Sequence, residues 1–244
     1  MKAIIHIIGC GLLAALSLSS CSVNATKGNG KIVEKEIAIH DYSILNLGGW
    51  EAQVVYQQSD EAPYLKIECD ENILPLLEIR SANDSLTIQP PKEDLGRFIT
   101  TQFRIQTNSR SIKVINLAGK IQFEVADSLI APDLEIALAG ASRLHAPKMR
   151  VDDLRLNIAG KCDADLSGSA EQVELNLAGQ CSYRAMELKT SELNTNIAGS
   201  CSMEVYVTDK IKLSEMGKCD ITYKGNPSIE HEGVTLGNIK QIGE

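Results

Sequence analysis

A four-residue phrase ending in glycine returns six times between residues 116 and 217, and it limits the fold more than any other feature of the chain. Its copies are NLAG at Asn116, ALAG at Ala137, NIAG at Asn157, NLAG at Asn176, NIAG at Asn196 and SEMG at Ser214. The final glycines are separated by 21, 20, 19, 20 and 18 residues; they are Gly119, Gly140, Gly160, Gly179, Gly199 and Gly217. Repeats of this length are typical of β-solenoids.

Apolar residues alternate with polar ones on both sides of each glycine. Four and two residues before it, the first copy has Ile115 and Leu117, and apolar positions of the same parity follow it at Ile121, Phe123 and Val125. A period of two predicts strands, and a recurring glycine between them predicts a corner where a Cβ would not fit. Helical repeats are usually longer and have a period of 3.6. The sequence therefore predicts an all-β parallel β-helix with coils of about 20 residues.

Two residue types recur at fixed positions and should form ladders along the stack. Asparagines stand three residues before the glycine at Asn116, Asn157, Asn176 and Asn196, and an alanine precedes the glycine in five of the six copies. Stacked amides can hydrogen-bond along the axis, so the Asn row is interpreted first as coil-stabilising. With the small Ala row beside it, this face should be flat enough to dock a glycan, another protein or another copy.

Cysteines stand two residues after the glycine at Cys162, Cys181, Cys201 and Cys219. Four thiolates in a line at about 4.8 Å per coil would span roughly 14 Å, too far for one tetrahedral metal ion. Parallel Cβ atoms at that spacing also fit a disulfide poorly. We expect mostly free, buried thiols; a strained disulfide between neighbours and, least favoured, metal binding are the alternatives.

The N-terminus has the pattern of an export signal. Residues 1–20 contain Lys2, an apolar stretch and then Leu18-Ser19-Ser20 before Cys21. Leu-Ser-Ser-Cys resembles the lipobox of bacterial lipoproteins, which implies cleavage before Cys21, acylation of that cysteine and anchoring at the outer membrane. An ordinary secretory signal or a transmembrane anchor is the alternative. The sequence leaves open which face of the outer membrane the protein occupies.

Charge and length restrict the remaining possibilities. The net charge is −8, and loss of Lys2 with the signal makes it −9, which argues against nucleic acid as a partner. We expect residues 21–30 to be a lipidated tether and 31–244 a single domain. Within it we expect wider, less regular coils over 31–111, regular repeats over 112–225 and a C-terminal cap over 226–244.

The first half of the chain shows several strand patterns without the repeated phrase. The expected strands run over 32–39, 43–47, 52–57, 64–69, 86–89 and 102–106, with a helical turn or short helix between Asp70 and Glu78 and a turn at Asn83-Asp84.

Several of these patterns together resemble the bacterial adhesin family with a head GIN domain. They are Gly28-Asn29-Gly30, a hairpin from Tyr42-Ser43-Ile44 to Val54-Val55-Tyr56, Ser85-Leu86-Thr87-Ile88 and the Ala-Gly-x-Cys/Ser coils. The resemblance implies an exported, often lipidated protein with a right-handed parallel β-helix. The family motif is structural, so no catalytic or cofactor-binding residue is carried over.

The most enzyme-like grouping lies on outward positions after the glycine. It contains Arg143, His145, Asp163 and Asp165, and β-helix polysaccharide lyases and hydrolases place carboxylates and a basic residue on such a face. Alternating charges on stacked strands explain the same residues as a surface ladder. We therefore expect no cofactor, no metal and no enzyme, but an adhesin or surface scaffold with unknown oligomeric state. A carbohydrate-active enzyme and a passive periplasmic binding or structural module are the alternatives.

Overall fold

The computed structural model describes residues 25–91, 98–235 and 237–243. Strands dominate it, with one 3-10 helix, η1 (Leu74–Leu76), and no α-helix among these residues. The first strands are β1 (Thr26–Lys27), β2 (Ile32–Ala38), β3 (Ile44–Gln58), β4 (Tyr64–Asp70), β5 (Glu78–Ala82), β6 (Ser85–Gln89), β7 (Phe98–Ile99) and β8 (Phe103–Ser109). The later ones are β9 (Val114–Val125), β10 (Ser128–Gly140), β11 (Arg143–Gly160), β12 (Asp163–Lys224), β13 (Ser228–Thr235) and β14 (Ile239–Gln241). The expected all-β class is confirmed.

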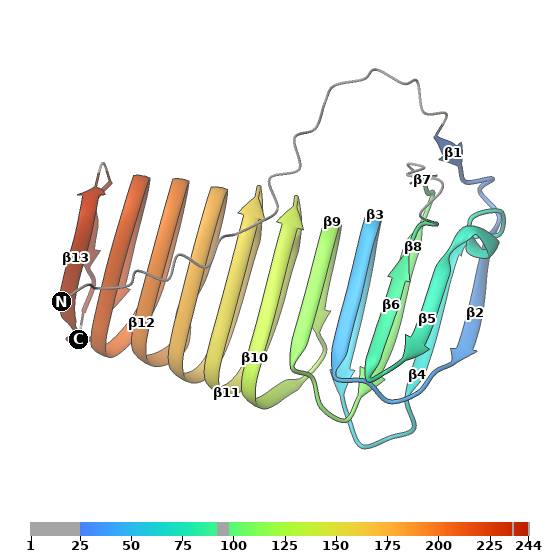
Figure 1. Ribbon diagram of the computed structural model, residues 1–244, viewed down its shortest axis with the longest axis horizontal. Coiled ribbons are helices and arrows are strands. Elements are labelled where there is room, and N and C mark those ends of the chain that lie inside the picture. The colour runs from blue at the N-terminus through green and yellow to red at the C-terminus, as the bar shows by residue number, and fades with distance from the viewer. Residues whose placement is uncertain (1–24, 92–97, 236, 244) are drawn as a thin grey trace, which may run out of the picture.

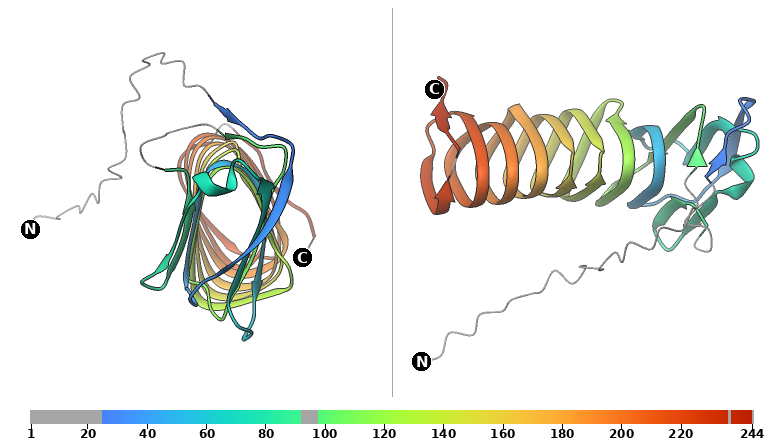
Figure 2. Two further views of the ribbon diagram at one scale, coloured as in Figure 1. Left: turned by 90° about the vertical axis from the view of Figure 1, so that its right-hand side faces the viewer. Right: turned by 90° about the horizontal axis from the view of Figure 1, so that it is seen from above.

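One sheet of twelve strands holds most of the described residues. Its main path runs β13-β12-β11-β10-β9-β3-β8-β4-β2, and Figure 1 shows these strands side by side along the long axis of the molecule. Seen along that axis, the ribbons of successive repeats overlap around a common interior (Figure 2). The proposed signal peptide, residues 1–20, and Cys21 lie outside the described residues.

Successive repeats pair in parallel with their phrase glycines in register. Gly140 pairs with Gly119, Gly160 with Gly140 and Gly179 with Gly160. The register therefore advances by one sequence repeat from each strand to the next, as the spacing of the phrase predicts. β12 contains the last three phrases because its backbone stays in strand conformation through the corners.

The corner glycines cannot carry a side chain. Gly160 has φ +110°, a region that L-residues rarely adopt, and a Cβ built on it would overlap the carbonyl oxygen of Gly140 in the preceding repeat. The same overlap with the preceding corner recurs at Gly179, Gly199 and Gly217. The column of glycines thus allows the backbones of neighbouring repeats to approach at each corner.

The predicted inward positions form the core. In the first repeat Ile115, Leu117, Ile121, Phe123 and Val125 are all buried. The last repeat departs from the pattern, because the position two residues before its glycine holds Glu215. This side chain is buried too, and the His231 Nε2 of β13 lies 3.7 Å from its Oε2.

The predicted hairpin between Tyr42 and Tyr56 is wrong. In its place β3 is one strand with a register shift between Gly48 and Trp50, and both of its halves pair in parallel with β9. Gly49, with φ +99°, turns the strand at this point. The two halves therefore extend the stack of repeats by one further coil and do not pair with each other.

The segment before the repeats differs from the expected wider coils. β2 pairs antiparallel with β4, β4 pairs antiparallel with β8, and β5 forms an antiparallel pair with β6. β5 has no counterpart among the predicted strands. It joins β6 through Asn83 and Asp84, whose φ angles of 53° and 59° suit the two-residue turn of a hairpin. The predicted turn and the short helix, η1, are confirmed.

Candidate binding surfaces

The predicted Asn row forms a directional chain of hydrogen bonds. Asn196 Nδ2 donates to Asn176 Oδ1 at 2.8 Å, and Asn176 Nδ2 donates to Asn157 Oδ1 at 3.0 Å. Asn116 Nδ2 donates in the same direction to Asn46 Oδ1 of β3, a residue that the repeat count did not include. Ala137 separates the two runs.

The Ala row lies beside the Asn row and makes the surface apolar. Ala118, Ala139, Ala159 and Ala178 are exposed, and they line a hollow of about 770 Å³. Pro90 and Pro91, which follow β6, also line it. We call this surface of Asn, Ala and flanking Pro residues the Asn–Ala face. It is a shallow, open trough, close to the flat profile that the sequence predicted.

A second, polar hollow of about 780 Å³ lies next to the Asn–Ala face and shares Asn196 with it. Its charged side chains neutralise one another in part: Arg155 Nε lies 3.0 Å from Glu174 Oε2. The hydrogen bond from Arg155 is the main reason why the pKa of Glu174 is lowered.

The cysteine row is buried, and its thiols face backbone carbonyl groups. Cys162 and Cys181 are within 3.7 Å and 3.9 Å of the glycine carbonyl oxygens of the preceding repeats, Gly140 and Gly160. Ser142 occupies the same place one repeat earlier and donates to Gly119 O at 3.2 Å. The structure has free, buried thiols at Cys69, Cys162, Cys181, Cys201 and Cys219.

The thiolate is disfavoured at three of the four cysteines of this row, whereas the hydrogen bond with Cys181 lowers the pKa of Cys201. Burial raises the pKa of Cys162, and it raises that of Cys219 to about 12. The pKa of Cys181 is raised first by its hydrogen bond with Cys201 and then by burial. No group of three or more His, Cys, Asp or Glu residues suited to a metal ion occurs within residues 25–91, 98–235 and 237–243.

The four residues of the enzyme-like grouping stand on adjacent strands but do not share one hollow. Arg143 pairs in register with Asp163, and His145 with Asp165. Arg184 lies 3.8 Å from a carboxylate oxygen of each aspartate, and Arg143 Nη2 lies 3.5 Å from Asp163 Oδ2. The two carboxylates are therefore part of a surface ion-pair network.

Arg143 and His145 also lie beside residues of β3, β8 and β9, on the side away from Asp163 and Asp165. They line a hollow of about 390 Å³ between β8, β3, β9 and β11. We name it the Arg–Gln hollow, after its polar lining of Gln53, Arg104, Gln106, Gln122, Glu124, Arg143 and His145. Sequence reasoning missed it because Gln53 and Arg104 belong to strands outside the repeats.

Asp70 holds the N-terminal segment against the sheet, a role that no sequence pattern indicated. Its buried carboxylate accepts the backbone N–H of Gly30 at 2.8 Å and of Thr101 at 2.7 Å. Burial by itself would raise the pKa of Asp70, but these N–H groups hold it below its usual value. The Gly28-Asn29-Gly30 motif is thus tied to β4, and Asn72 Nδ2 adds a bond to Lys27 O at 2.8 Å.

None of the described segments is a helix with the length and apolar character needed to span a membrane. This finding does not concern Cys21, whose predicted acylation lies outside the described residues.

Residues 41–227 match the family described as "Putative auto-transporter adhesin, head GIN domain". No curated protein matches the chain. A crystal structure from Parabacteroides distasonis, described as a "Putative lipid binding protein", is 25% identical, with a TM-score of 0.72 over 90% of this chain and 100% of that chain.

Two further crystal structures, described as putative adhesins, have the same fold. The one from Bacteroides fragilis is 19% identical with a TM-score of 0.79, over 89% of this chain and 100% of that chain. The one from Parabacteroides merdae is 22% identical with a TM-score of 0.64, over 89% of this chain and 99% of that chain. The family and these three structures are described as adhesins or lipid-binding proteins, not as enzymes.

Proposed function

Since the chain belongs to the head GIN domain family of auto-transporter adhesins, we propose that it is a non-enzymatic adhesin or scaffold of the cell envelope. Its stacked repeats form a right-handed parallel β-helix, and its binding surface is the Asn–Ala face. Acylated Cys21 anchors it at the outer membrane, and one domain follows the tether.

The Asn–Ala face is the observation that carries this proposal. Its alanines are exposed in four consecutive repeats while the neighbouring asparagines satisfy one another by hydrogen bonds. A continuous apolar surface rimmed by polar groups is a feature of protein and ligand interaction sites. Its rigid backbone keeps the cost of ordering the surface on binding low.

The parallel register supports the β-helix. Each strand from β9 to β12 pairs with the next at an offset of one repeat, which a sheet built of hairpins would not produce. The position of the tether supports the anchor, because Gly28-Asn29-Gly30 is fixed at one end of the stack by Asp70. The opposite end is then directed away from the lipid.

Binding of purified protein to whole cells, glycans and envelope proteins tests the adhesive role. We would use the Cys21→Ser protein, which should be exported without lipid, and compare it with the same protein carrying Ala159→Arg and Ala178→Arg. Arginines at these exposed positions should abolish binding, whereas Ala141→Arg, an exposed alanine outside the trough, should preserve it. Absence of binding by the unsubstituted protein would contradict the adhesive role and favour a passive structural one.

Lipid binding is a second candidate function. The apolar floor of the trough favours it, as does the description of the P. distasonis protein with 25% identity. Fluorescent fatty acids and phospholipids, added to the same variants, separate the two functions. Loss of lipid binding in the protein with both Ala159→Arg and Ala178→Arg, without any loss of cell binding, would show that the trough binds lipid and not an adhesion partner.

The anchor has its own test. Replacement of Cys21 by Ser should move the protein from the detergent phase to the aqueous phase on phase separation. Unchanged partitioning would contradict acylation.

A further inference from the structure

We propose that the Arg–Gln hollow is a binding site for an acidic saccharide, with the two arginines holding its carboxylates. This goes beyond the proposed adhesive function by adding a second binding surface with its own ligand class. The hollow lies apart from the Asn–Ala face and shares no lining residue with it.

Four of the side chains come from one row across four strands. Arg104 of β8 pairs in register with Gln53 of β3, Gln53 with Gln122 of β9, and Gln122 with Arg143 of β11. At about 4.8 Å between strands, the two arginines stand roughly 14 Å apart with two amides between them. The row runs along the stack, so it presents a cation at each end of a line of neutral hydrogen-bonding groups.

The polar groups of the hollow are available for a ligand. The side chains of Gln122, Glu124 and His145 make no hydrogen bond or ion pair with any residue that the structure describes. Arg104 makes only a 3.4 Å contact with Gln53 Oε1. By comparison, five of the seven described arginines are ion-paired: Arg80, Arg110, Arg143, Arg155 and Arg184.

These side chains suit the chemistry of an acidic sugar. A guanidinium group presents paired N–H donors that match a carboxylate, and the amides of Gln53 and Gln122 can both donate to and accept from hydroxyl groups. The volume of about 390 Å³ falls within the range of small-ligand sites. The chain as a whole is acidic, yet Arg104 makes no ion pair with any residue that the structure describes, although Glu68 of β4 is its register partner.

Two carboxylate side chains near the arginines compete with an anionic ligand for them. Asp163 Oδ2 lies 3.5 Å from Arg143 Nη2, and Glu124 places a second carboxylate in the hollow. Both should repel an anionic ligand. Removing either negative charge should therefore strengthen binding, which would not be expected if the ligand were neutral.

Binding of the full-length Cys21→Ser protein to an array of oligosaccharides containing uronic or sialic acids tests the proposal. Methyl-esterified oligogalacturonate serves as the neutral partner of oligogalacturonate, and polyglutamate as a non-sugar carboxylate. We expect binding to at least one acidic saccharide, weakening with added salt. No binding to the methyl ester and none to polyglutamate are expected.

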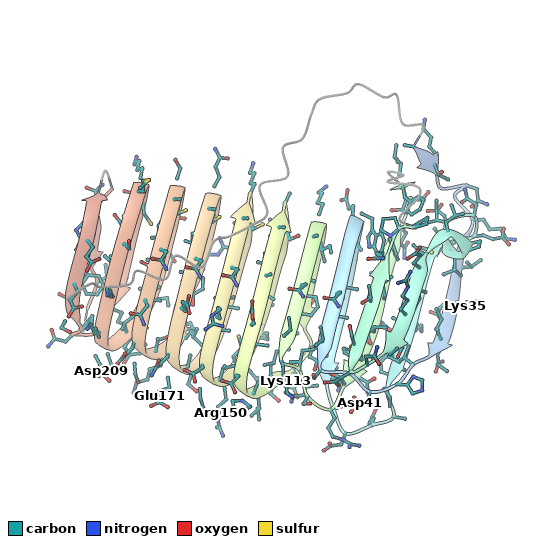
Figure 3. The ribbon with its side chains drawn as sticks, viewed as in Figure 1. Lys35, Asp41, Lys113, Arg150, Glu171 and Asp209 are labelled. Carbon is teal, nitrogen blue, oxygen red and sulfur yellow. The ribbon has the colours of Figure 1, made fainter. Side chains whose placement is uncertain are left out.

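Variants at each end of the row locate the site. Arg104→Ala and Arg143→Ala should each weaken binding by about tenfold or more, and Asp163→Asn and Glu124→Gln should strengthen it by up to about fivefold. Arg150→Ala is the matched control, because Arg150 is exposed and carries no ion pair with a described residue; Figure 3 shows it along the lower edge of the ribbons, between Glu171 and Lys113. It should leave binding unchanged.

Three kinds of result would overturn the proposal. Failure to bind any acidic saccharide, equal binding of the methyl ester or polyglutamate, or equal losses in Arg150→Ala and Arg104→Ala would do so. The adhesive role can survive this failure, because cell binding that depends on Ala159 and Ala178 would persist. Conversely, Ala159→Arg and Ala178→Arg should leave saccharide binding unchanged, because the Arg–Gln hollow shares no lining residue with the Asn–Ala face.

Discussion

Asn176 donates a side-chain hydrogen bond to Asn157 across 3.0 Å, although 19 residues separate the two in the sequence. The repeat length brings the amides together, and each amide donates toward the N-terminal end of the stack. Ala137 interrupts the row, since it stands in register between Asn116 and Asn157.

We therefore expect Ala137→Asn to stabilise the protein by about 0.5 to 1 kcal/mol, because the new amide can join the two runs. Urea unfolding measures the change in the free energy of unfolding. Ala159→Asn is the control, since its neighbours in register are alanine residues on both sides. An equal gain from both substitutions would show that the effect does not arise from the ladder.

Gly160→Ala should destabilise the protein by at least about 2 to 3 kcal/mol, because the methyl group combines an unfavourable φ with overlap of Gly140 O. Gly30→Ala separates the two causes. Gly30 also has a positive φ, of +78°, but open space surrounds the position of its Cβ, so its cost should be only about 1 to 2 kcal/mol. Equal costs in chemical denaturation would mean that stacking of the corners contributes nothing.

Asp70→Asn should cost about 1.5 to 3 kcal/mol at neutral pH, through loss of charge-assisted hydrogen bonds to Gly30 and Thr101. The pKa of Asp70 is lowered in the folded protein, so its carboxylate stabilises the fold above the unfolded-state pKa of about 3.9, and this contribution disappears as the pH falls through the folded-state pKa. Thermal unfolding should therefore show a difference between wild type and variant that shrinks in acid. A difference independent of pH would contradict the ionic role.

Cys219 should make the protein less stable in alkali. Burial raises its pKa from the usual 9.0 to about 12, so the unfolded state loses the thiol proton first, and stability declines as the pH rises from about 9 toward 12. Cys219→Ala should cost about 1 kcal/mol at pH 7 through lost burial and should show a weaker decline in alkali. Melting curves of both proteins between pH 7 and 11 compare them; parallel curves would contradict this assignment.

The repeats could be predicted because one local rule generates them. The glycine spacing and the alternation of apolar residues depend on neighbours a few positions away, and the register of Gly140 with Gly119 follows from them. The segment before β9 follows no such rule. There, the antiparallel pairing of β4 depends on contacts with β2 and β8 that no short sequence pattern encodes.

The candidate site was predictable only in part for the same reason. Arg143 and His145 belong to a repeat and could be placed on an outward row, whereas their partners Arg104 and Gln53 become neighbours through long-range pairing. For Glu215, the position could be predicted from the sequence but the contact could not. The phrase locates it at an inward position, but nothing near it in sequence indicates that His231 would face it.

Because neighbouring strands are offset by one repeat, the length of the stack is proportional to the number of repeats. Every repeat contacts mainly the repeats before and after it, so duplication of one unit would preserve all corners and ladders and add one more rung of about 4.8 Å. The distance between the end held by Asp70 and the far end at β13 can thus change in steps during evolution. In the proposed lipid-anchored arrangement, the reach from the envelope is then set by the number of repeats, independently of the chemistry displayed on any one of them.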